Sequence, residues 1–258
     1  MNYWVERNLR TQNRLTKKGI ADTEEQLRKY YSRAMDKVIE QFENTYNKIL
    51  AATAEGRQPT PADLYKLDTY WQMQGQLQRE LQRLGDRQAV LLGRQFTNQF
   101  QAVYDSLAIP GQTAFTQIDT EVARQMINQI WCADGKTWSQ RIWDNTDRLR
   151  EALNEQLISC LVTGKKPSEL KKILQEEFNV SYNRADSLVR TEMSHIQTQA
   201  AQKRYTDYGI QEVEVWADED ERRCEVCGQL HQKRYPIGGA MPIPAHPNCR
   251  CTILPVVE

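Results

Sequence analysis

The sequence has few histidines and cysteines and no long apolar run. Its 258 residues include three His and six Cys, and 40% of them are hydrophobic. No segment approaches the roughly 20 apolar residues that span a bilayer. The N-terminus, MNYWVERNLRTQNRLTKKGI, lacks the apolar centre of a signal peptide. These absences predict a protein that is made and kept in a cytoplasm, where thiols stay reduced.

The sequence also lacks an excess of charge of either sign. Its 34 Lys and Arg balance its 34 Asp and Glu. Dedicated DNA-binding modules are usually basic on one face, and no basic stripe with interleaved aromatic residues is present. The composition therefore does not indicate a dedicated nucleic-acid-binding protein, and the length fits one large domain or two smaller ones.

Helical patterns are abundant in the first two-thirds of the chain. Asp22 followed by Glu25 resembles a capping box and predicts a helix start. Apolar residues then recur at steps of three and four from Leu27 to Leu50, which predicts one face of a long helix. Gly56 is the predicted stop.

A second long helix is predicted from Thr60, its cap, and Pro61, its first residue. Its apolar stripe runs from Leu64 to Leu107, and Pro110 and Gly111 are expected to end it. Three glycines fall inside the stripe, and each costs about 1 kcal/mol relative to Ala in a helix. We therefore expect at least one break or kink, at Gly75, Gly85 or Gly93. Stripes of this length usually pack together in a bundle.

Shorter elements are predicted downstream. The expected helices are 116–130, 138–162 ended by Gly164, 167–178, and a longer one from its cap Ser181 to Tyr208, closed by Gly209. QEVEVWA alternates like a strand, and CTILPVV is a second short strand candidate. The predicted fold is thus mainly α: a long-helix region at 1–110, shorter helices at 111–180, and a small α+β module at 181–258.

Four cysteines and two histidines gather between Cys224 and Cys251. The pattern is C-x2-C, eighteen residues, then H-x2-C-x-C. Such turns and spacings are typical of zinc sites. A loop-rich segment with few apolar residues cannot build a large core and is often stabilised by a bound metal ion. The sequence favours Cys224, Cys227, His246 and Cys249 as ligands, with Cys251 as the first substitute. His231 also competes.

Other states of these thiols stay open at this point. Disulfides would form outside the cell, and the thiols could also carry no metal. A redox pair would need a thioredoxin-like context, which is absent. The H-x-E and H-E-x-x-H patterns of zinc deaminases and proteases are absent too. We therefore expect a structural zinc ion and no enzymatic activity. Cys132 and Cys160 are predicted to be small core residues.

The motifs at the C-terminal end resemble the MuF-like minor head proteins of tailed bacteriophages, the head-morphogenesis family. The resemblance rests on the R-T-E of 190–192, the Gly209 turn, Trp216, the acidic-then-Arg run of 218–222, the C-x2-C of 224–227 and the closing H-P-x-C-R-C of 246–251. It is strong over about Ser181–Pro255. The sequence ends a few residues later, so the resemblance predicts no effector domain here.

The resemblance implies a low-copy virion protein, made in the host cytoplasm and placed at the portal vertex or head interior. Its expected partners are the portal protein and the major capsid or scaffold proteins, with a weak contact to packaged DNA and none to a membrane. Two other functions remain open: a metal-dependent nuclease acting on packaged DNA, and a DNA-binding internal protein.

Several residues of these motifs have structural interpretations as well. Arg190 and Glu192 lie near Asp186 on one helix, which is typical of a solvated face. Alternatively, one of them is fixed against the zinc loop by pairing with Arg222 or Asp218. Arg250, which lies between two candidate ligands, is a further supporting residue. Three tryptophans, Trp131, Trp138 and Trp143, are expected to pack the helical core.

Overall fold

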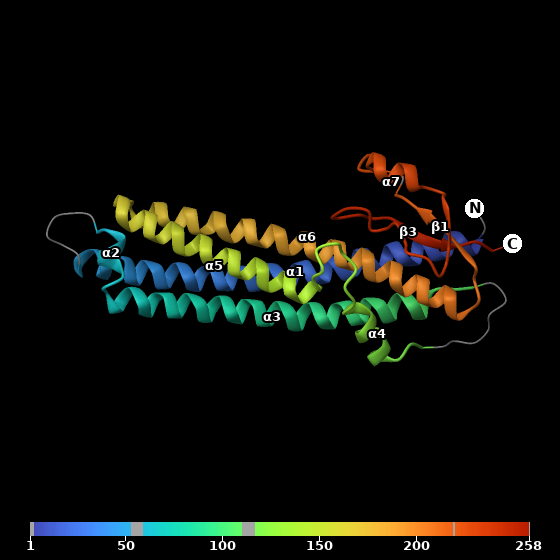
Figure 1. The fold of residues 1–258 in the computed structure, drawn as a ribbon, viewed down its shortest axis with the longest axis horizontal. Coiled ribbons are helices and arrows are strands. Elements are labelled where there is room, and N and C mark those ends of the chain that lie inside the picture. Colours follow the sequence, from blue (N-terminus) through green and yellow to red (C-terminus); the bar gives the residue numbers. More distant parts are fainter. Residues whose placement is uncertain (1–2, 53–58, 110–116, 219, 258) are drawn as a thin grey trace. The chain divides into compact units, whose positions relative to one another are not determined.

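The computed structural model describes residues 3–52, 59–109, 117–218 and 220–257. Figure 1 shows long helices accompanied by a small sheet. The elements in chain order are α1 (Tyr3–Ala52), α2 (Pro61–Leu64), α3 (Asp68–Ser106), α4 (Thr120–Ile127), α5 (Trp138–Thr163), α6 (Pro167–Asp207), β1 (Glu212–Trp216), α7 (Glu225–Leu230), β2 (Arg234–Pro236) and β3 (Thr252–Pro255). The mainly α class with a small α+β part is confirmed. The predicted stops at Gly56 and at Pro110–Gly111, and the predicted start at Thr116, lie outside the described residues.

The chain divides into two compact units, and neither is a continuous stretch. The first unit comprises Met1–Glu24, Leu91–Trp138 and Asp186–Glu258, and the second comprises Glu25–Val90 and Ser139–Ala185. Each unit therefore takes a different part of the same long helices. The boundaries of these units differ from those of the regions predicted at 1–110, 111–180 and 181–258, and that division into regions stays a prediction.

The first helix begins much earlier than the sequence predicted. α1 starts at Tyr3, and Asp22 lies within it rather than at its cap. The apolar stripe starts only at Leu27, because the inward positions before it are polar. Asn8 and Gln12 are completely buried, and a periodicity of apolar residues cannot register such positions.

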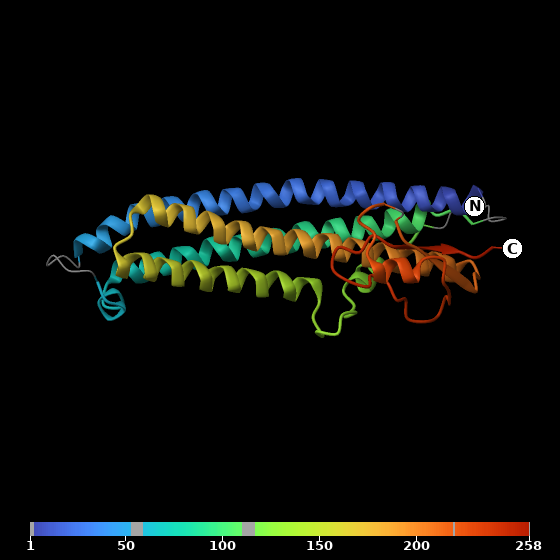
Figure 2. The ribbon, with the colours of Figure 1, turned by 90° about the horizontal axis from the view of Figure 1, so that it is seen from above.

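Hydrogen bonds inside the first unit satisfy these polar side chains. Asn8 donates from Nδ2 to the carbonyl of Ala108 at 2.7 Å and accepts the Ala108 N–H at 2.9 Å. Gln12 donates to the carbonyl of Ile253 at 3.0 Å and accepts from the Thr252 hydroxyl. In Figures 1 and 2 the sheet accordingly lies beside the end of α1 marked N. The start of the chain thus docks on the last strand.

The predicted start at Thr60 is confirmed, but the helix that follows is short. Thr60 and Asp63 form a capping box around Pro61, and α2 ends at Leu64. The main helix, α3, begins at Asp68.

The predicted break inside the second long helix is wrong. α3 continues without interruption past Gly75, Gly85 and Gly93. In the second unit, a Cβ built on Gly85 would lie 2.4 Å from the ring of Trp143, so this glycine makes room for an indole. Close packing outweighs the helix-propensity cost at this position.

The downstream helices agree with the prediction to different degrees. α4 is capped by Asp119 and spans only eight residues. α5 agrees with its prediction, and Gly164 after it has a φ of +66°. The helices predicted at 167–178 and from Ser181 are one helix, α6. The separate cap at Ser181 is therefore wrong, while the Gly209 turn is confirmed by its φ of +75°.

Ser181 instead belongs to a buried polar cluster in the second unit. The Tyr31 hydroxyl lies 3.2 Å from the Ser181 hydroxyl and 3.4 Å from the Gln88 amide oxygen. Asn145 donates to the Tyr31 oxygen at 3.1 Å and to the Ser181 carbonyl at 2.9 Å. Burial raises the pKa of Tyr31 to about 12, so its proton stays in place. The cluster links segments of α1, α3, α5 and α6, and apolar side chains of the same helices are buried as well.

The sheet belongs to the first unit and has the order β2-β1-β3 with antiparallel pairing throughout. Val213 and Val215 of β1 are buried, as the alternation predicted. Val213 pairs with Tyr235 of β2, and Val215 pairs with Ile253 of β3. The short edge strand β2 and helix α7 were not predicted. Among the described helices, none combines the length and apolarity needed to cross a membrane.

Candidate metal centre

The first pair of candidate ligands lies at the start of α7. Cys224 is the N-cap residue, with extended backbone angles, and its sulfur accepts the N–H of Cys227 at 3.4 Å. A thiol here occupies the place that Ser or Asp takes in other helices. The turn of helix that follows brings Cys227 back beside Cys224, so the C-x2-C spacing directs both sulfurs to one region. Cys227 is 4% exposed.

The second group comes from the loop that leads into β3. A turn closes from the Cys249 N–H to the His246 carbonyl at 3.2 Å. Asn248, inside it, has a φ of +61°, a conformation that Asn tolerates better than most residues. Cys249 and Cys251 are 2% and 3% exposed. The pairing of Thr252 with β1 fixes the end of this loop.

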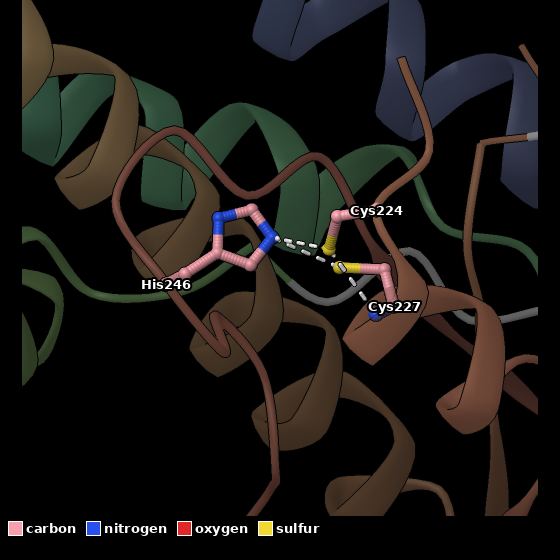
Figure 3. A group of neighbouring side chains, drawn as sticks. All are labelled: Cys224, Cys227 and His246. Atoms are coloured by element: carbon pink, nitrogen blue, oxygen red, sulfur yellow. Dashed lines mark hydrogen bonds between the residues drawn. The ribbon is translucent and has the colours of Figure 1, made fainter. Parts of the chain in front are cut away.

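The ligand atoms from the two segments meet. Figure 3 shows the Nε2 atom of His246 facing the sulfurs of Cys224 and Cys227, at 3.2 Å and 3.1 Å. The sulfurs of Cys227 and Cys249 lie 3.8 Å apart. The edges of a tetrahedron around zinc would be about 3.8 Å between sulfurs and about 3.5 Å between sulfur and nitrogen. The observed separations are close to these values.

The five predicted ligands form two overlapping groups. Cys224, Cys227 and His246 form one, and Cys227, Cys249 and Cys251 form the other; within each group the ligand atoms lie within 4.8 Å of one another. Cys227 belongs to both, so its sulfur joins the two halves. The structure thus contains a Cys/His cluster able to hold a metal ion, as the sequence predicted.

The histidine is held in the form that a metal needs. Nδ1 of His246 lies 2.8 Å from the carbonyl oxygen of Pro247. Because a carbonyl can only accept, Nδ1 carries a proton, and in the neutral imidazole the lone pair of Nε2 then faces the two sulfurs. A carbonyl commonly fixes the tautomer of a metal-binding histidine in this way. The same bond is the main cause that raises the pKa of His246.

The thiols differ in their readiness to ionise. Hydrogen bonding from Cys251 lowers the pKa of Cys249 to about 5, which favours its thiolate form. The N–H of Cys227 lowers the pKa of Cys224. Burial raises the pKa of Cys227 to about 12, and the neighbouring Cys249 raises the pKa of Cys251. Without a cation the cluster therefore keeps protons, which binding of a divalent metal would release.

Two features next to the cluster hold its loops. Arg250 pairs with Asp218 at 2.9 Å and with Asp220 at 2.6 Å, which supports its predicted role beside the ligands. Arg250 is also the main cause that keeps the pKa of Asp220 well below its usual range. On the other side, the Asn248 N–H donates to the Thr191 hydroxyl at 3.0 Å.

The R-T-E motif thus reaches the cluster through Thr191 rather than through its charged members. The predicted pairing of Arg190 or Glu192 with Arg222 or Asp218 is wrong. Arg190 forms ion pairs with Asp186 and Glu24. Glu192 is 2% exposed and accepts a hydrogen bond from the Trp131 indole at 3.1 Å. It is therefore not on a solvated face.

The remaining candidates lie outside the cluster. His231 accepts the Ala217 N–H on Nδ1 and contacts the ring of Trp216, and it belongs to neither group of ligand atoms. Cys160 is buried, as predicted. Cys132 is half-buried in a turn, which corrects its placement in a helical core. Of the three tryptophans, Trp138 is a core residue, whereas Trp131 and Trp143 are only half-buried.

Comparison with known proteins finds similarity over part of the chain. Residues 151–254 match the sequence model described as "Phage Mu protein F like protein". An alignment over 142 residues, which covers 48% of this chain, shows 28% identity to "NAD(+)--arginine ADP-ribosyltransferase EFV" of Enterococcus faecalis. The stretch covers 29% of that protein, so the chain spans less than a third of the length of this curated relative. No solved structure matches the chain.

The matched residues include the last part of α5, all of α6, the sheet and all five candidate metal ligands. The motifs that carry the resemblance, from residue 190 to residue 251, lie within residues 151–254. The resemblance is therefore confirmed: residues 151–254 form a MuF-like region, characteristic of phage head-morphogenesis proteins.

Proposed function

We propose that the chain is a low-copy minor head protein of a tailed bacteriophage or prophage, resident in the virion at the portal vertex or head interior. The observation that carries this proposal is the MuF-like match over residues 151–254. The protein would take part in head assembly, DNA packaging or ejection. Its helices would contact the portal protein and the major capsid or scaffold proteins, with a weak contact to packaged DNA.

A structural Zn²⁺ ion is the second part of the proposal. Cys224, Cys227 and His246 would supply three ligands, and Cys249 the fourth, with Cys251 as its substitute. Cysteine and histidine ligands at tetrahedral spacing suit zinc among the common divalent metals. The ion would join α7 to the loop before β3, where few apolar residues are available to do so.

The role we propose is structural rather than enzymatic. Four protein ligands around zinc close its coordination, whereas a catalytic zinc keeps one position for water or substrate. Cys227, Cys249 and Cys251 are each no more than 4% exposed, which supports a closed site. Cleavage of plasmid DNA by the purified protein with added divalent metal, if lost in Glu192→Ala or His246→Ala variants that still fold, would contradict this role.

The head-protein role is tested on particles. Purified virions and procapsids should contain the chain at a few copies per particle, measured by quantitative mass spectrometry against the portal protein. Deleting the gene should lower the yield of filled or infectious heads, and the intact gene supplied in trans should restore it. A protein found only in host cytosol, never in procapsids or virions, would refute the proposal.

The metal is tested separately on the purified chain. Elemental analysis should find about one zinc per chain, and thiol titration before and after chelation should show the ligand thiols becoming reactive. Cys227→Ser should abolish zinc binding, because Cys227 belongs to both groups of ligand atoms. Cys132→Ser, a change outside both groups, should retain it. Intact disulfides among the four C-terminal cysteines would refute the zinc assignment and leave the head-protein role unaffected.

A further inference from the structure

A charged cavity lies between α1 and α3 in the second unit and shares no residue with the candidate metal centre. Its volume is about 330 Å³. Four basic side chains line it: Arg33 and Lys37 from α1, and Arg83 and Arg87 from α3. Asp36 and Glu80 are the acidic residues among its walls, so the lining carries a net charge of four minus two, or +2.

Without a ligand, neighbouring basic side chains of this cavity repel one another. Arg33 and Lys37 are four residues apart on one helix, and Arg83 and Arg87 are four residues apart on the other. Like charges at this spacing repel each other on a helix surface. Here two such pairs line one cavity. An anion in the cavity would turn this repulsion into attraction.

Glu80 accounts for only two of the four cations. Its carboxylate lies 2.5 Å from Nη1 of Arg83 and 3.7 Å from Nζ of Lys37. Glu80 is 8% exposed, so it holds these two side chains from within the wall. Among the residues that the structure describes, Arg33 and Arg87 have no hydrogen-bond or ion-pair partner. Each guanidinium therefore keeps its donors for a ligand.

We propose that this cavity binds a phosphate group. Two free guanidinium groups, one on each helix, offer paired N–H donors that match the oxygens of a phosphate. Lys37 and Arg83, already oriented by Glu80, add positive charge beside them. The cavity exceeds the size of one phosphate, and Tyr30 lies in its wall. The phosphate is therefore expected to be part of a larger molecule, such as a nucleotide or the end of a DNA strand.

The experiment measures binding of three probes to the full chain by isothermal titration calorimetry. The probes are inorganic phosphate, a deoxynucleoside monophosphate and a short single-stranded oligonucleotide, each at matched ionic strength with chloride as the reference anion. Arg33→Gln and Arg87→Gln remove the two free guanidinium groups. Arg148→Gln is the matched control, since Arg148 is an exposed arginine of α5 in the same unit and does not line the cavity.

We expect each cavity variant to weaken phosphate binding about tenfold or more, because a charged hydrogen-bond donor is lost. Arg148→Gln should bind like the unchanged chain. The variants should fold as well as the unchanged chain, because the two arginines have no partners to lose, and thermal unfolding without phosphate checks this. Tighter binding of the nucleotide or the oligonucleotide than of inorganic phosphate would identify the source of the group.

Two results would overturn the proposal. One is no phosphate binding beyond that of chloride at the same ionic strength. The other is equal affinity in the cavity variants and the Arg148→Gln control, which would mean that phosphate binds elsewhere.

Discussion

Replacing Gly85 with Ala should destabilise the protein, although Ala is the better helix former. Gly85 lies inside α3, where the change would gain about 1 kcal/mol from helix propensity. The new Cβ, however, would lie 2.4 Å, 2.7 Å and 3.0 Å from three ring carbons of Trp143. Forcing an extra methyl group into a packed contact costs typically about 1–3 kcal/mol. The net change in the free energy of unfolding is then between roughly zero and a loss of about 2 kcal/mol.

Gly75 provides a matched control on the same helix. A Cβ there meets only the end of the Arg79 side chain at 3.4 Å, and that side chain can move aside. Gly75→Ala should therefore keep most of the propensity gain and stabilise the protein by about 0.5–1 kcal/mol. The free energies of unfolding of the two variants should differ by about 0.5–3 kcal/mol, with Gly85→Ala the less stable.

Urea unfolding followed by circular dichroism measures both free energies. Trp143→Leu removes most of the obstructing ring, so a double-mutant cycle isolates the steric term. In that background, Gly85→Ala should become stabilising, as Gly75→Ala is. If Gly85→Ala stabilises the chain as much as Gly75→Ala does while Trp143 is intact, the close-packing account of this glycine is refuted.

Two further predictions concern the polar contacts of the first unit. Gln12→Ala should lower the free energy of unfolding, measured in urea, by about 2–3 kcal/mol, because it leaves the Ile253 carbonyl and the Thr252 hydroxyl buried without this partner. The control Arg14→Ala changes an exposed residue and should alter the free energy of unfolding by no more than about 0.5 kcal/mol. Equal effects of the two changes would refute the docking of α1 on β3. Thr191→Val should weaken zinc binding about 10–100-fold in a chelator competition, because it removes the hydroxyl that accepts the Asn248 N–H. Thr191→Ser keeps that hydroxyl and should bind zinc as the unchanged chain does. Unchanged zinc affinity in Thr191→Val would show that this contact does not support the loop before β3.

The sequence predicted the structure best where a residue type has one typical structural role. Glycine at a positive φ ends α5 and α6 at Gly164 and Gly209, as predicted. The C-x2-C pair, followed by H-x2-C-x-C, identified all five members of the Cys/His cluster. The alternation of β1 indicated its buried face correctly. These signals depend on local backbone geometry, which neighbouring residues determine.

The errors arose where a distant segment decides what a residue does. Gly85 favours a break by propensity, but an indole from α5 occupies the space beside it. Ser181 has the composition of a cap, but its carbonyl and hydroxyl take part in a buried cluster with Tyr31 and Asn145. Asn8 and Gln12 are polar, so the apolar periodicity did not mark their buried positions, where the carbonyls of Ala108 and Ile253 accept hydrogen bonds from them. No local pattern contains these partners.

The same long-range contacts bear on how the MuF-like region folds. Residues 151–254 include β3 and α6, yet Gln12 of α1 contacts β3 and Trp131 contacts Glu192 of α6, and both partners lie outside the matched residues. Removing them would leave a buried carbonyl and a buried carboxylate without these hydrogen bonds, which costs more than the bonds contribute when formed. A metal ion at the Cys/His cluster would not compensate for this loss, because the candidate ligands join only α7 to the loop before β3. The matched residues are therefore expected to need parts of α1 and the segment around Trp131 in order to fold stably.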